Sequence, residues 1–240
     1  MTKEERLKAE HERIMLMYET QHELSQGSKF VFGIDEAGRG PLCGPVVAAC
    51  CILRDEDEIL YLNDSKKISE KRREELFKQI KESALSYGIG IANEKLIDEV
   101  NILNATLTAM HEAFEACLEM YREKCSKRIS DGFGDDPAAL FDSIPSMSDS
   151  IFLVDGNKEI PELLFKQLPI VGGDAKCPAI SAASILAKVT RDHMMLEYAE
   201  QYPEYGFAKN KGYGTKEHIE ALKKYGPLNI HRRSFLKNIL

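Results

Sequence analysis

The chain has 240 residues, of which 43% are hydrophobic and 30% charged, and its formal net charge is −7. This length suits one substantial domain, or one domain with a small appendage, and the composition is that of a soluble globular protein. The charged N-terminus MTKEERLKAEHER lacks the apolar segment of a secretory signal, and PVVAACCIL is too short to span a bilayer, so we expect a cytoplasmic protein without membrane association.

The cysteines and the charge distribution exclude further classes. None of the six cysteines has the close spacing of a zinc site or a disulfide framework, and we expect free thiols. Residues 201–240 contain eight Lys or Arg and three acids, so the net charge of this segment is +5 and that of the rest of the chain is −12. Such a segment either binds a polyanion or forms a solvated helical surface, and charge alone does not distinguish the two.

The first half of the chain predicts helices and strands in alternation. Apolar residues recur at helical spacing over residues 2–24, and "QGSK" ends this helix. Two apolar strands follow, at 30–35 and 45–53, joined by a short turn rich in glycine and proline. Ser69 is a candidate N-cap for the next helix, and 84–92 alternates like a third strand.

The second half continues with long helices and two further strands. Residues 93–124 predict one long helical stretch, or two segments meeting near Asn101 to Asn104. The acidic residues 126–149 predict a flexible surface loop. Strands are expected at 151–155 and within 164–175, then a helix opened by Pro178 and another capped by Thr215 and stopped by Gly226.

This order of elements predicts the α/β class, with one mixed sheet flanked by helices. We divide the chain into an N-terminal helical extension, residues 1–27, and a catalytic domain, residues 28–240, which includes the C-terminal helices.

Acidic residues follow two of the most apolar predicted strands. Asp35 and Glu36 come directly after FVFGI, and Asp155 follows IFLV. A single acid at such a place is usually a turn former or helix cap. Strand ends in open α/β sheets, however, are where ligand crevices form, so three acids at two strand ends indicate a candidate site.

The helix after Pro178 carries a polar stripe through an otherwise apolar sequence. Ser181, Ser184, Lys188 and Asp192 are spaced by three, four and four residues, which places them on one face. The stripe is either a surface pair with two serines or one wall of a site, and the Ala- and Ile-rich neighbours favour the second.

Together these acids suggest a hard cation. Asp35, Glu36, Asp155 and Asp192 offer only oxygen ligands, which suit Mg²⁺ or Mn²⁺ better than zinc. Carboxylates that converge repel one another unless divalent cations lie between them, an arrangement typical of two-metal phosphoryl transfer.

Two glycine-containing segments complete the candidate site. The glycines of GRG, Gly38 to Gly40, allow a ligand close to the backbone, and Arg39 suits a phosphate, although glycines also make tight turns. YGFAKNKGYGTKEH interleaves aromatic residues, including Tyr213, with lysines. This pattern suits either nucleic-acid stacking or a loop packed on the core.

At this point the motifs resemble a known family. DEAGRGPLCGPVVAA, NDSKKIS, ILNATLTAM, LVDGN, ISAASILAKVTRDH and GYGTKEH occur in the order found in bacterial type-2 ribonuclease H, ribonuclease HII. The resemblance covers about residues 28 to 236 apart from the 126–149 loop. It implies a ribonuclease H-like fold and metal-dependent cleavage of RNA in RNA–DNA hybrids. It also implies nicking of duplex DNA 5′ of an embedded ribonucleotide, leaving 3′-hydroxyl and 5′-phosphate ends.

The resemblance also implies roles for residues and a biological context. The family's metal-binding and catalytic carboxylates fall on Asp35, Glu36, Asp155 and Asp192. Its substrate-binding residues fall on the 2′-hydroxyl reader Gly38, Arg39 and Gly40, the sugar-stacking Tyr213, and the phosphate contacts Lys66, Ser184 and Lys188. We expect a monomer acting in primer RNA removal and ribonucleotide excision repair, while the replication-factor partner and the physiological metal stay open.

Two departures and two alternatives remain. The 126–149 loop is longer than expected for the family, and the N-terminal helix is too short for the extra domain of ribonuclease HIII, whose DESG differs from DEAGRG here. The same acids would also suit a hybrid-specific or 3′-end exonuclease, and a degenerate site would leave a binding module without turnover. Product mapping separates the exonuclease, and intact acids weigh against the binding module.

Overall fold

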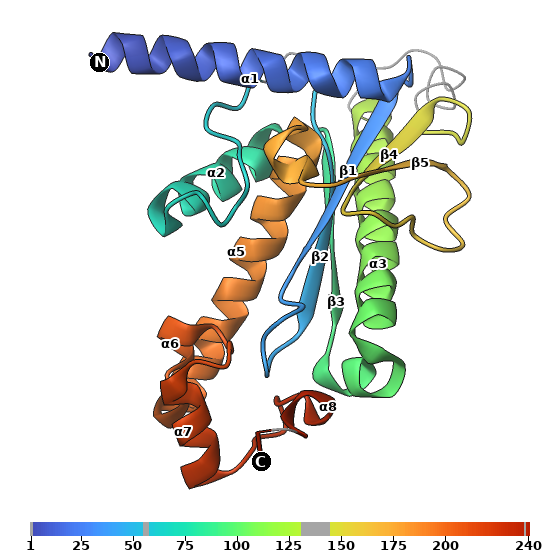
Figure 1. The fold of residues 1–240 in the computed structure, drawn as a ribbon. Helices are drawn as coiled ribbons and strands as arrows, with labels where there is room; N and C mark the ends of the chain where they lie inside the picture. Colours follow the sequence, from blue (N-terminus) through green and yellow to red (C-terminus); the bar gives the residue numbers. More distant parts are fainter. Residues whose placement is uncertain (1, 55–57, 131–144, 238) are drawn as a thin grey trace.

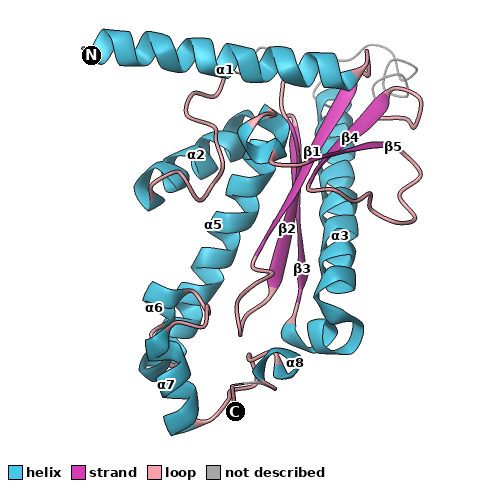
Figure 2. Cartoon of the chain, viewed as in Figure 1, coloured by secondary structure: helices cyan, strands magenta, loops and turns pink. Residues whose placement is uncertain are grey.

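The computed structural model describes residues 2–54, 58–130, 145–237 and 239–240, and within them a mixed sheet is covered by helices on both faces (Figure 1, Figure 2). The strand order is β3-β2-β1-β4-β5, with β2 antiparallel to both β1 and β3, and with β4 parallel to both β1 and β5. The strands are β1 (Phe30–Ala37), β2 (Val46–Ile52), β3 (Ser86–Ala92), β4 (Ser150–Asp155) and β5 (Lys166–Ile170). The α/β class and the mixed sheet are confirmed.

The helices divide between the two faces and the two ends of the sheet. One face is covered by α3 and the other by α5 and α2, while α1 crosses the end where β1 begins and α6 to α8 lie toward the end where β1 finishes (Figure 1). They are α1 (Lys3–Ser25), α2 (Glu70–Ser83), α3 (Glu94–Ser130), α5 (Pro178–Gln201), α6 (Phe207–Asn210), α7 (Lys216–Tyr225) and α8 (Arg233–Leu236), with 3₁₀ turns η1 (Gly173–Ala175) and η2 (Pro203–Tyr205).

The predicted helix boundaries are confirmed where they rest on a capping residue. Ser69 caps α2 through Arg72 N, Pro178 opens α5, and Thr215 caps α7 through His218 N. The Ser69 and Thr215 side chains each accept a hydrogen bond from a backbone N–H of the first turn that has no partner within the helix. Pro178 has a φ angle already restricted to the helical range. The short elements η1, η2, α6 and α8 were not predicted, because three or four residues show no periodicity.

The break expected near Asn101 to Asn104 lies at Asn101. This residue has a left-handed φ of 70° inside α3, and its Oδ1 accepts hydrogen bonds from Leu103 N at 3.0 Å and Asn104 N at 3.1 Å. Asn101 therefore ends the first segment and caps the second, a role for which asparagine is suited.

The loop prediction over 126–149 is wrong at its start. Residues 126–130 continue α3, which ends at Ser130. No glycine or proline interrupts the chain before Gly132, and Lys127 lies near the helix C-terminus, where a cation is favourable. Residues 131–144 lie outside the described part. Before β4, Ser146 N and Oγ both donate to Asp149 Oδ1 at 2.7 Å, forming an ordered turn.

Two apolar layers hold the sheet between its helices. On the α3 side Phe32 stacks on Phe152 at 4.4 Å between ring centroids, and Phe114 meets both rings edge-on. On the other side Gly33 lets α5 approach closely, because a Cβ there would lie 2.1 Å from the backbone of Ala179. This contact fixes the start of α5 against β1, and with it the distance between β1 and the polar stripe of α5.

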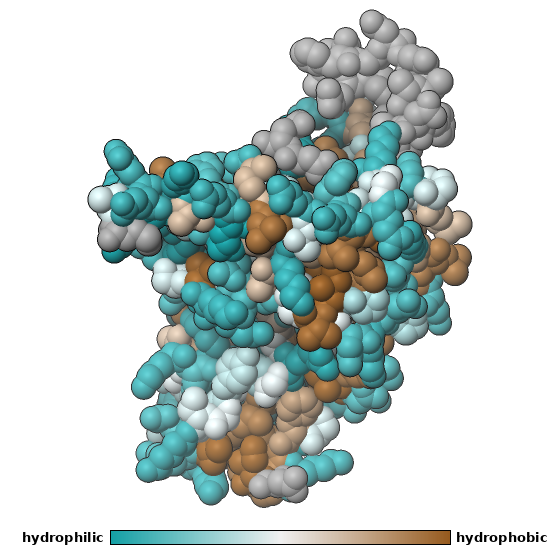
Figure 3. Space-filling model, turned by 45° about the horizontal axis from the view of Figure 1, so that its top comes forward, coloured by the Kyte–Doolittle hydropathy of each residue, from teal (hydrophilic) through white to brown (hydrophobic). Residues whose placement is uncertain are grey.

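Helix α1 packs on the rest of the chain through its C-terminal half. Ile14 and Met17 are buried in the cluster that also contains α5, and Gln21 Oε1 accepts a hydrogen bond from Ala179 N. The face drawn in Figure 3 is mostly hydrophilic, with apolar side chains in separate groups. None of the helices in the described ranges has the length and apolar character needed to cross a membrane. The division at residue 27 stays a prediction.

Candidate active site

The carboxylates of β1 and β4 meet at one edge of the sheet. β1 and β4 are parallel, with Ile34 opposite Val154, so Asp35 and Asp155 are the next residues along neighbouring strands. Asp35 is buried, with 5% of its surface exposed. The Asp155 carboxylate accepts a hydrogen bond from Gly173 N at 2.8 Å, which holds η1 against the end of β4.

Electrostatic repulsion acts between these carboxylates. Burial raises the pKa of Asp35 well above its ordinary value, and the charges of Glu36 and Asp155 raise it further. Burial also raises the pKa of Glu36, although Arg39 opposes this shift from 3.1 Å. A group of acids that destabilise one another when ionised is one that a divalent cation would stabilise.

Asp192 is neutralised differently. Its Oδ1 accepts a hydrogen bond from Lys188 Nζ at 2.7 Å, and Arg73 Nη2 lies 3.9 Å from its other oxygen. The structure therefore brings Asp35, Glu36 and Asp155 into electrostatic contact, whereas Asp192 is held in its own ion pair on α5. A cation shared by all four would compete with Lys188 for Asp192.

A cleft of ≈ 800 Å³ opens beside these acids. All seven residues predicted to bind substrate line it, together with Glu36 and two arginines that the motifs did not single out. The predicted residues are Gly38, Arg39, Gly40, Lys66, Ser184, Lys188 and Tyr213, and the arginines are Arg73 and Arg191. Asp35, Asp155 and Asp192 are not part of the lining, but Asp35 precedes Glu36 on β1 and Asp192 pairs with Lys188, and both Glu36 and Lys188 line the cleft.

The GRG turn and Tyr213 face each other across one part of the cleft. Gly38 has φ +95°, and a Cβ there would lie 2.0 Å from Arg191 Nε, so no other residue fits without a shift. Arg39 and Tyr213 are exposed, with Tyr213 showing 44% of its surface. A Cβ on Gly40 would lie 3.6 Å from the Tyr213 ring, so the ring borders the turn.

The polar stripe of α5 is buried, and its members have different partners. Ser181 donates to Asn63 O and lies away from the cleft lining. The Ser184 hydroxyl donates to Ser65 Oγ at 3.0 Å, so it links α5 to the segment before α2. The stripe is thus one wall of the cleft rather than a surface pair.

The aromatic residues of the C-terminal segment separate into two groups. Tyr205 and Phe207 are buried and stacked, with ring centroids 5.4 Å apart, whereas Tyr213 is exposed at the cleft. Core packing therefore explains the first two, and of these three residues only Tyr213 lines the cleft.

Sequence reasoning missed Asp174, a fifth acid near the site. Burial raises the pKa of Asp174 to about 6, and the charges of Asp155 and Asp64 contribute to this shift. Asp174 lies in η1, four residues beyond the end of β5, whereas Asp155 is the last residue of β4, so the pattern of an acid directly after an apolar run did not single it out. Arg73 and Arg191 gave no signal either, since each lies in a helix among other charged or polar residues.

One buried trio has the residue types of a metal site, but its hydrogen bonds argue otherwise. Within the described ranges, Cys43, His218 and His231 are the only His, Cys or acidic side chains that place three candidate ligand atoms within 4.8 Å of one another. Leu228 N donates to His231 Nδ1, so the neutral ring carries its proton on Nε2, which lies 3.1 Å from His218 Nε2. His218 Nδ1 in turn donates to Tyr213 O at 2.9 Å. The two histidines form a hydrogen-bonded support for Tyr213, and burial raises the pKa of the neighbouring Cys43 thiol to about 12.

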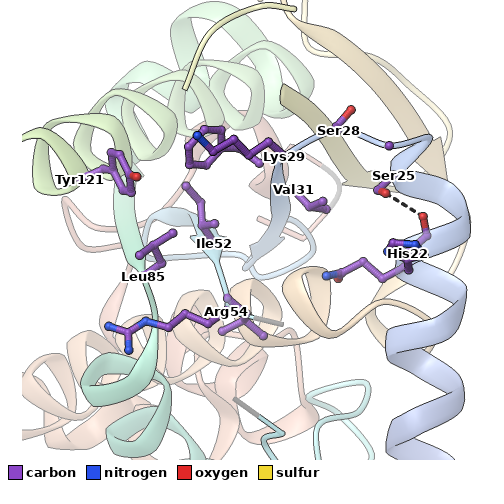
Figure 4. A pocket seen from close by; sticks show the side chains of 13 residues that line it. His22, Ser25, Ser28, Lys29, Val31, Ile52, Arg54, Leu85 and Tyr121 are labelled. Carbon is purple, nitrogen blue, oxygen red and sulfur yellow. Dashed lines mark hydrogen bonds between the residues drawn. The ribbon is translucent and has the colours of Figure 1, made fainter. Parts of the chain in front are cut away.

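A second cavity, of ≈ 760 Å³, lies at the opposite end of the sheet (Figure 4). It is lined by the end of α1, the start of β1 and residues such as Ile52, Leu85 and Tyr121. Among the described residues its lining includes no Asp or Glu, so they offer no counterpart to the acidic edge. All six cysteines are free, as expected.

Comparisons with known proteins find relatives that cover most of this chain. The sequence model of the Ribonuclease HII family matches residues 32–238. A Ribonuclease HII of Caldanaerobacter subterraneus subsp. tengcongensis is 52% identical over 216 residues, covering 90% of this chain and 77% of that protein. A Ribonuclease HII of Ruminiclostridium cellulolyticum is 46% identical, covering 98% of this chain and 83% of that protein.

Solved structures show the same fold. The structure of a PCNA:RNase HII complex from Archaeoglobus fulgidus matches with a TM-score of 0.57 and 26% identity, covering 85% of this chain and 94% of that one. The ribonuclease H2 of Pyrococcus horikoshii OT3 matches with a TM-score of 0.56 and 26% identity, over 85% and 93% of the two chains.

Proposed function

Because this chain belongs to the ribonuclease HII family, and is thus an endonuclease that cleaves RNA in RNA–DNA hybrids, we propose that it also nicks duplex DNA 5′ of a single embedded ribonucleotide. The products would carry 3′-hydroxyl and 5′-phosphate ends. The observation that carries this proposal is the cleft itself, in which the GRG turn and Tyr213 lie beside an acidic edge. Residues that would contact the sugar of the ribonucleotide therefore lie next to the acids that would support phosphate hydrolysis.

We assign Asp35, Glu36, Asp155 and Asp192 to the binding of Mg²⁺ or Mn²⁺. They are oxygen donors, and burial together with the charges of Glu36 and Asp155 raises the pKa of Asp35, a cost of ionisation that a divalent cation would relieve. When bound, such ions activate water and stabilise the leaving oxygen of the phosphate. Lys188, which pairs with Asp192, would be free to meet a phosphate once Asp192 binds a cation.

The rest of the cleft supplies recognition. Backbone amides of the GRG turn would donate to the 2′-hydroxyl, the group that separates RNA from DNA. The exposed ring of Tyr213 would stack on the neighbouring sugar or base. Lys66, Arg39 and Lys188 would meet the phosphates on either side, and Ser184 would hold the Asp35 carboxylate in place.

A cleavage assay on defined duplexes tests the proposal. Three matched substrates, an all-DNA duplex, the same duplex with one ribonucleotide and an RNA–DNA hybrid, are incubated with Mg²⁺ or Mn²⁺, and both product ends are mapped. We expect internal cleavage of the last two and a nick 5′ of the single ribonucleotide. Stepwise shortening from a 3′ end would instead indicate an exonuclease, and binding without products would indicate a binding module.

The cellular setting follows from the same proposal. Removal of ribonucleotides from DNA, by excision repair or primer removal, would take place in the cytoplasm, a reducing compartment that suits free cysteines. We propose a monomer, because the residues assigned to metal and substrate all come from one chain. Light scattering at assay concentration checks this, and a dimer mass would contradict it.

A further inference from the structure

Arg232 is the most completely buried cation near the cleft. None of its surface is exposed, and it lies in the C-terminal segment just before α8. Its guanidinium donates five hydrogen bonds to backbone carbonyls of one turn: Nε to Gly44 O, Nη1 to Arg39 O and Pro41 O, and Nη2 to Gly38 O and Gly44 O, at 2.6–2.9 Å. A guanidinium has five N–H groups, so every donor is used.

No carboxylate neutralises this side chain. Among the ion pairs of the described residues, none includes Arg232. Glu94 and Asp98 both interact electrostatically with it, yet one Glu94 oxygen is buried without a hydrogen-bond partner and the Asp98 carboxylate accepts from Arg233 N and Ser234 N. A buried cation is costly unless its hydrogen bonds are satisfied. The carbonyls of Gly38, Arg39, Pro41 and Gly44 therefore hold Arg232 in place, and Arg232 fixes them in return.

The position of these carbonyls fixes where the amides of the turn point. All described peptide bonds are trans, so each carbonyl points opposite to the N–H of the following residue. Because Arg232 binds the carbonyls of Gly38 and Arg39, the N–H groups of Arg39 and Gly40 point away from it. In the part of the chain that the structure describes, neither amide donates to a protein acceptor. Both residues line the cleft.

Arg191 provides a comparison within the same molecule. It is 1% exposed and donates to the carbonyls of Cys43, Pro45 and Lys211. Two of the amides that follow those carbonyls are already used, because Gly44 N donates to Ile230 O and Gly212 N donates to Asn210 Oδ1. Arg191 therefore holds segments that already have hydrogen bonds of their own, whereas Arg232 also orients the amides of Arg39 and Gly40, which have no acceptor among the described residues.

We propose that Arg232 is a positioning residue for 2′-hydroxyl recognition, holding the GRG turn from behind so that the amides of Arg39 and Gly40 face the sugar of the ribonucleotide. This inference rests on the proposed function. Lysine cannot replace it, because an ammonium has three donors on a flexible stem and cannot bind carbonyls along the whole turn. The selectivity of the enzyme should therefore depend on a side chain that never touches substrate.

The test compares Arg232→Lys with Arg191→Lys on two duplexes. One contains a single ribonucleotide and the other a 2′-deoxy-2′-fluoro nucleotide at the same place, which keeps the size but is a weak acceptor. The measured ratio is kcat/KM for the ribonucleotide duplex divided by kcat/KM for the 2′-fluoro duplex. We expect Arg232→Lys to lower this ratio about tenfold, the effect of weakening about one hydrogen bond. Arg191→Lys should leave that ratio within about twofold of wild type, even if its Tm falls as far. An unchanged ratio in Arg232→Lys would overturn the inference.

Two further measurements keep the result interpretable. In Arg232→Ala, added guanidinium ion should restore the ratio, and failure to restore it in a folded variant counts against a positioning role. In the wild-type protein, the backbone amide resonances of Arg39 and Gly40 should shift when a ribonucleotide duplex binds with Ca²⁺, but not with an all-DNA duplex. Absence of that shift overturns the inference even if the variants do not fold. Failure of wild type to cut the single-ribonucleotide duplex would instead reject the proposed function.

Discussion

The two halves of the cleft carry buried charge in opposite ways. At the acidic edge, Asp35 is buried beside Glu36 and Asp155, and their charges raise its pKa. At the GRG turn, Arg191 and Arg232 are equally buried, but backbone carbonyls satisfy both guanidiniums. Carboxylates that repel one another mark the acidic edge as the half where ligand cations are expected. Guanidiniums that are fully hydrogen-bonded mark the GRG turn as the half whose geometry is fixed before a ligand binds.

The largest effect should come from removing one charge at the acidic edge. Asp35→Asn should lower kcat more than about 100-fold, because losing a ligand costs more than losing the support of one. The same change should raise Tm, since it removes a buried charge and its repulsion with Glu36 and Asp155. Cleavage kinetics and thermal unfolding at neutral pH measure the two effects.

Metal binding sharpens this prediction. Mn²⁺ should raise the Tm of wild type and not that of Asp35→Asn, because only the ionised site binds the cation. Glu119→Gln, at an exposed acid on α3, is the matched control and should change neither quantity. A fall in Tm for Asp35→Asn would show that the acidic edge is as well satisfied as the turn.

The support beneath Tyr213 should make the turn half sensitive to acid. Burial lowers the pKa of His231 from 6.5 to about 4, so the unfolded chain binds a proton that the folded chain does not. Its contribution to stability is present above pH 6.5 and is lost as pH falls toward 4, by about 3 kcal/mol in total. Urea unfolding between pH 7 and 4 should show this slope, reduced in His231→Gln and retained in His11→Gln, whose imidazole is exposed.

Tyr213 tests whether the turn half contributes through a ring. Tyr213→Ala should lower kcat/KM for the single-ribonucleotide duplex about 10- to 100-fold, the range for losing one stacking interaction. Tyr213→Phe should retain most activity, because the ring is kept. Tyr225→Ala is the control, since Tyr225 is also exposed but lies outside the cleft lining. Equal losses in Phe and Ala variants would point to the hydroxyl instead.

Lys188 tests how the fourth acid is neutralised. Lys188→Met should destabilise the metal-free protein by about 1–2 kcal/mol, because Asp192 then keeps only the distant Arg73. It should also lower the Mg²⁺ concentration needed for half-maximal Tm shift, since the competitor is gone. Lys188→Met/Asp192→Asn should regain part of the stability, and strict additivity in this cycle would deny the coupling.

The smallest effect concerns phosphate contacts. Lys66→Ala should weaken substrate binding and reduce the slope of log K against log salt by about one. Lys216→Ala, at an exposed lysine paired with Glu220, should leave the slope unchanged. A change for Lys216 and none for Lys66 would place phosphate binding on the C-terminal helices rather than in the cleft.

Features that depend on neighbours in the sequence could be predicted, and features that depend on distant contacts could not. Apolar strands ending in Asp35 and Asp155 predicted the acidic edge, and Ser69 and Thr215 predicted helix starts. The sequence alone, however, showed Arg232 only as one of eight cations in the basic segment 201–240, and gave no sign that it is fully buried. Burial is set by which elements pack together, and no local pattern records it.

Tyr213 makes the same point on a shorter scale. Like Tyr205 and Phe207, it is an aromatic residue with lysines nearby in the sequence, yet of the three only Tyr213 is exposed at the cleft. The difference arises because Tyr205 and Phe207 pack against α7 residues such as Leu222. Likewise, the spacing of Lys188 and Asp192 predicts their ion pair. It does not predict that Asp35, Glu36 and Asp155 form a separate group without Lys188.

The bond between Arg232 and Arg39 also has a consequence for the order in which the protein matures. The two residues are 193 positions apart, so the turn that begins at Gly38 leaves the ribosome long before the side chain that orients it. Contacts of such separation form late in folding, because a long loop must close first. The acidic edge could therefore exist in a nascent chain that does not yet distinguish a ribose from a deoxyribose, and fidelity would be the last property the enzyme acquires.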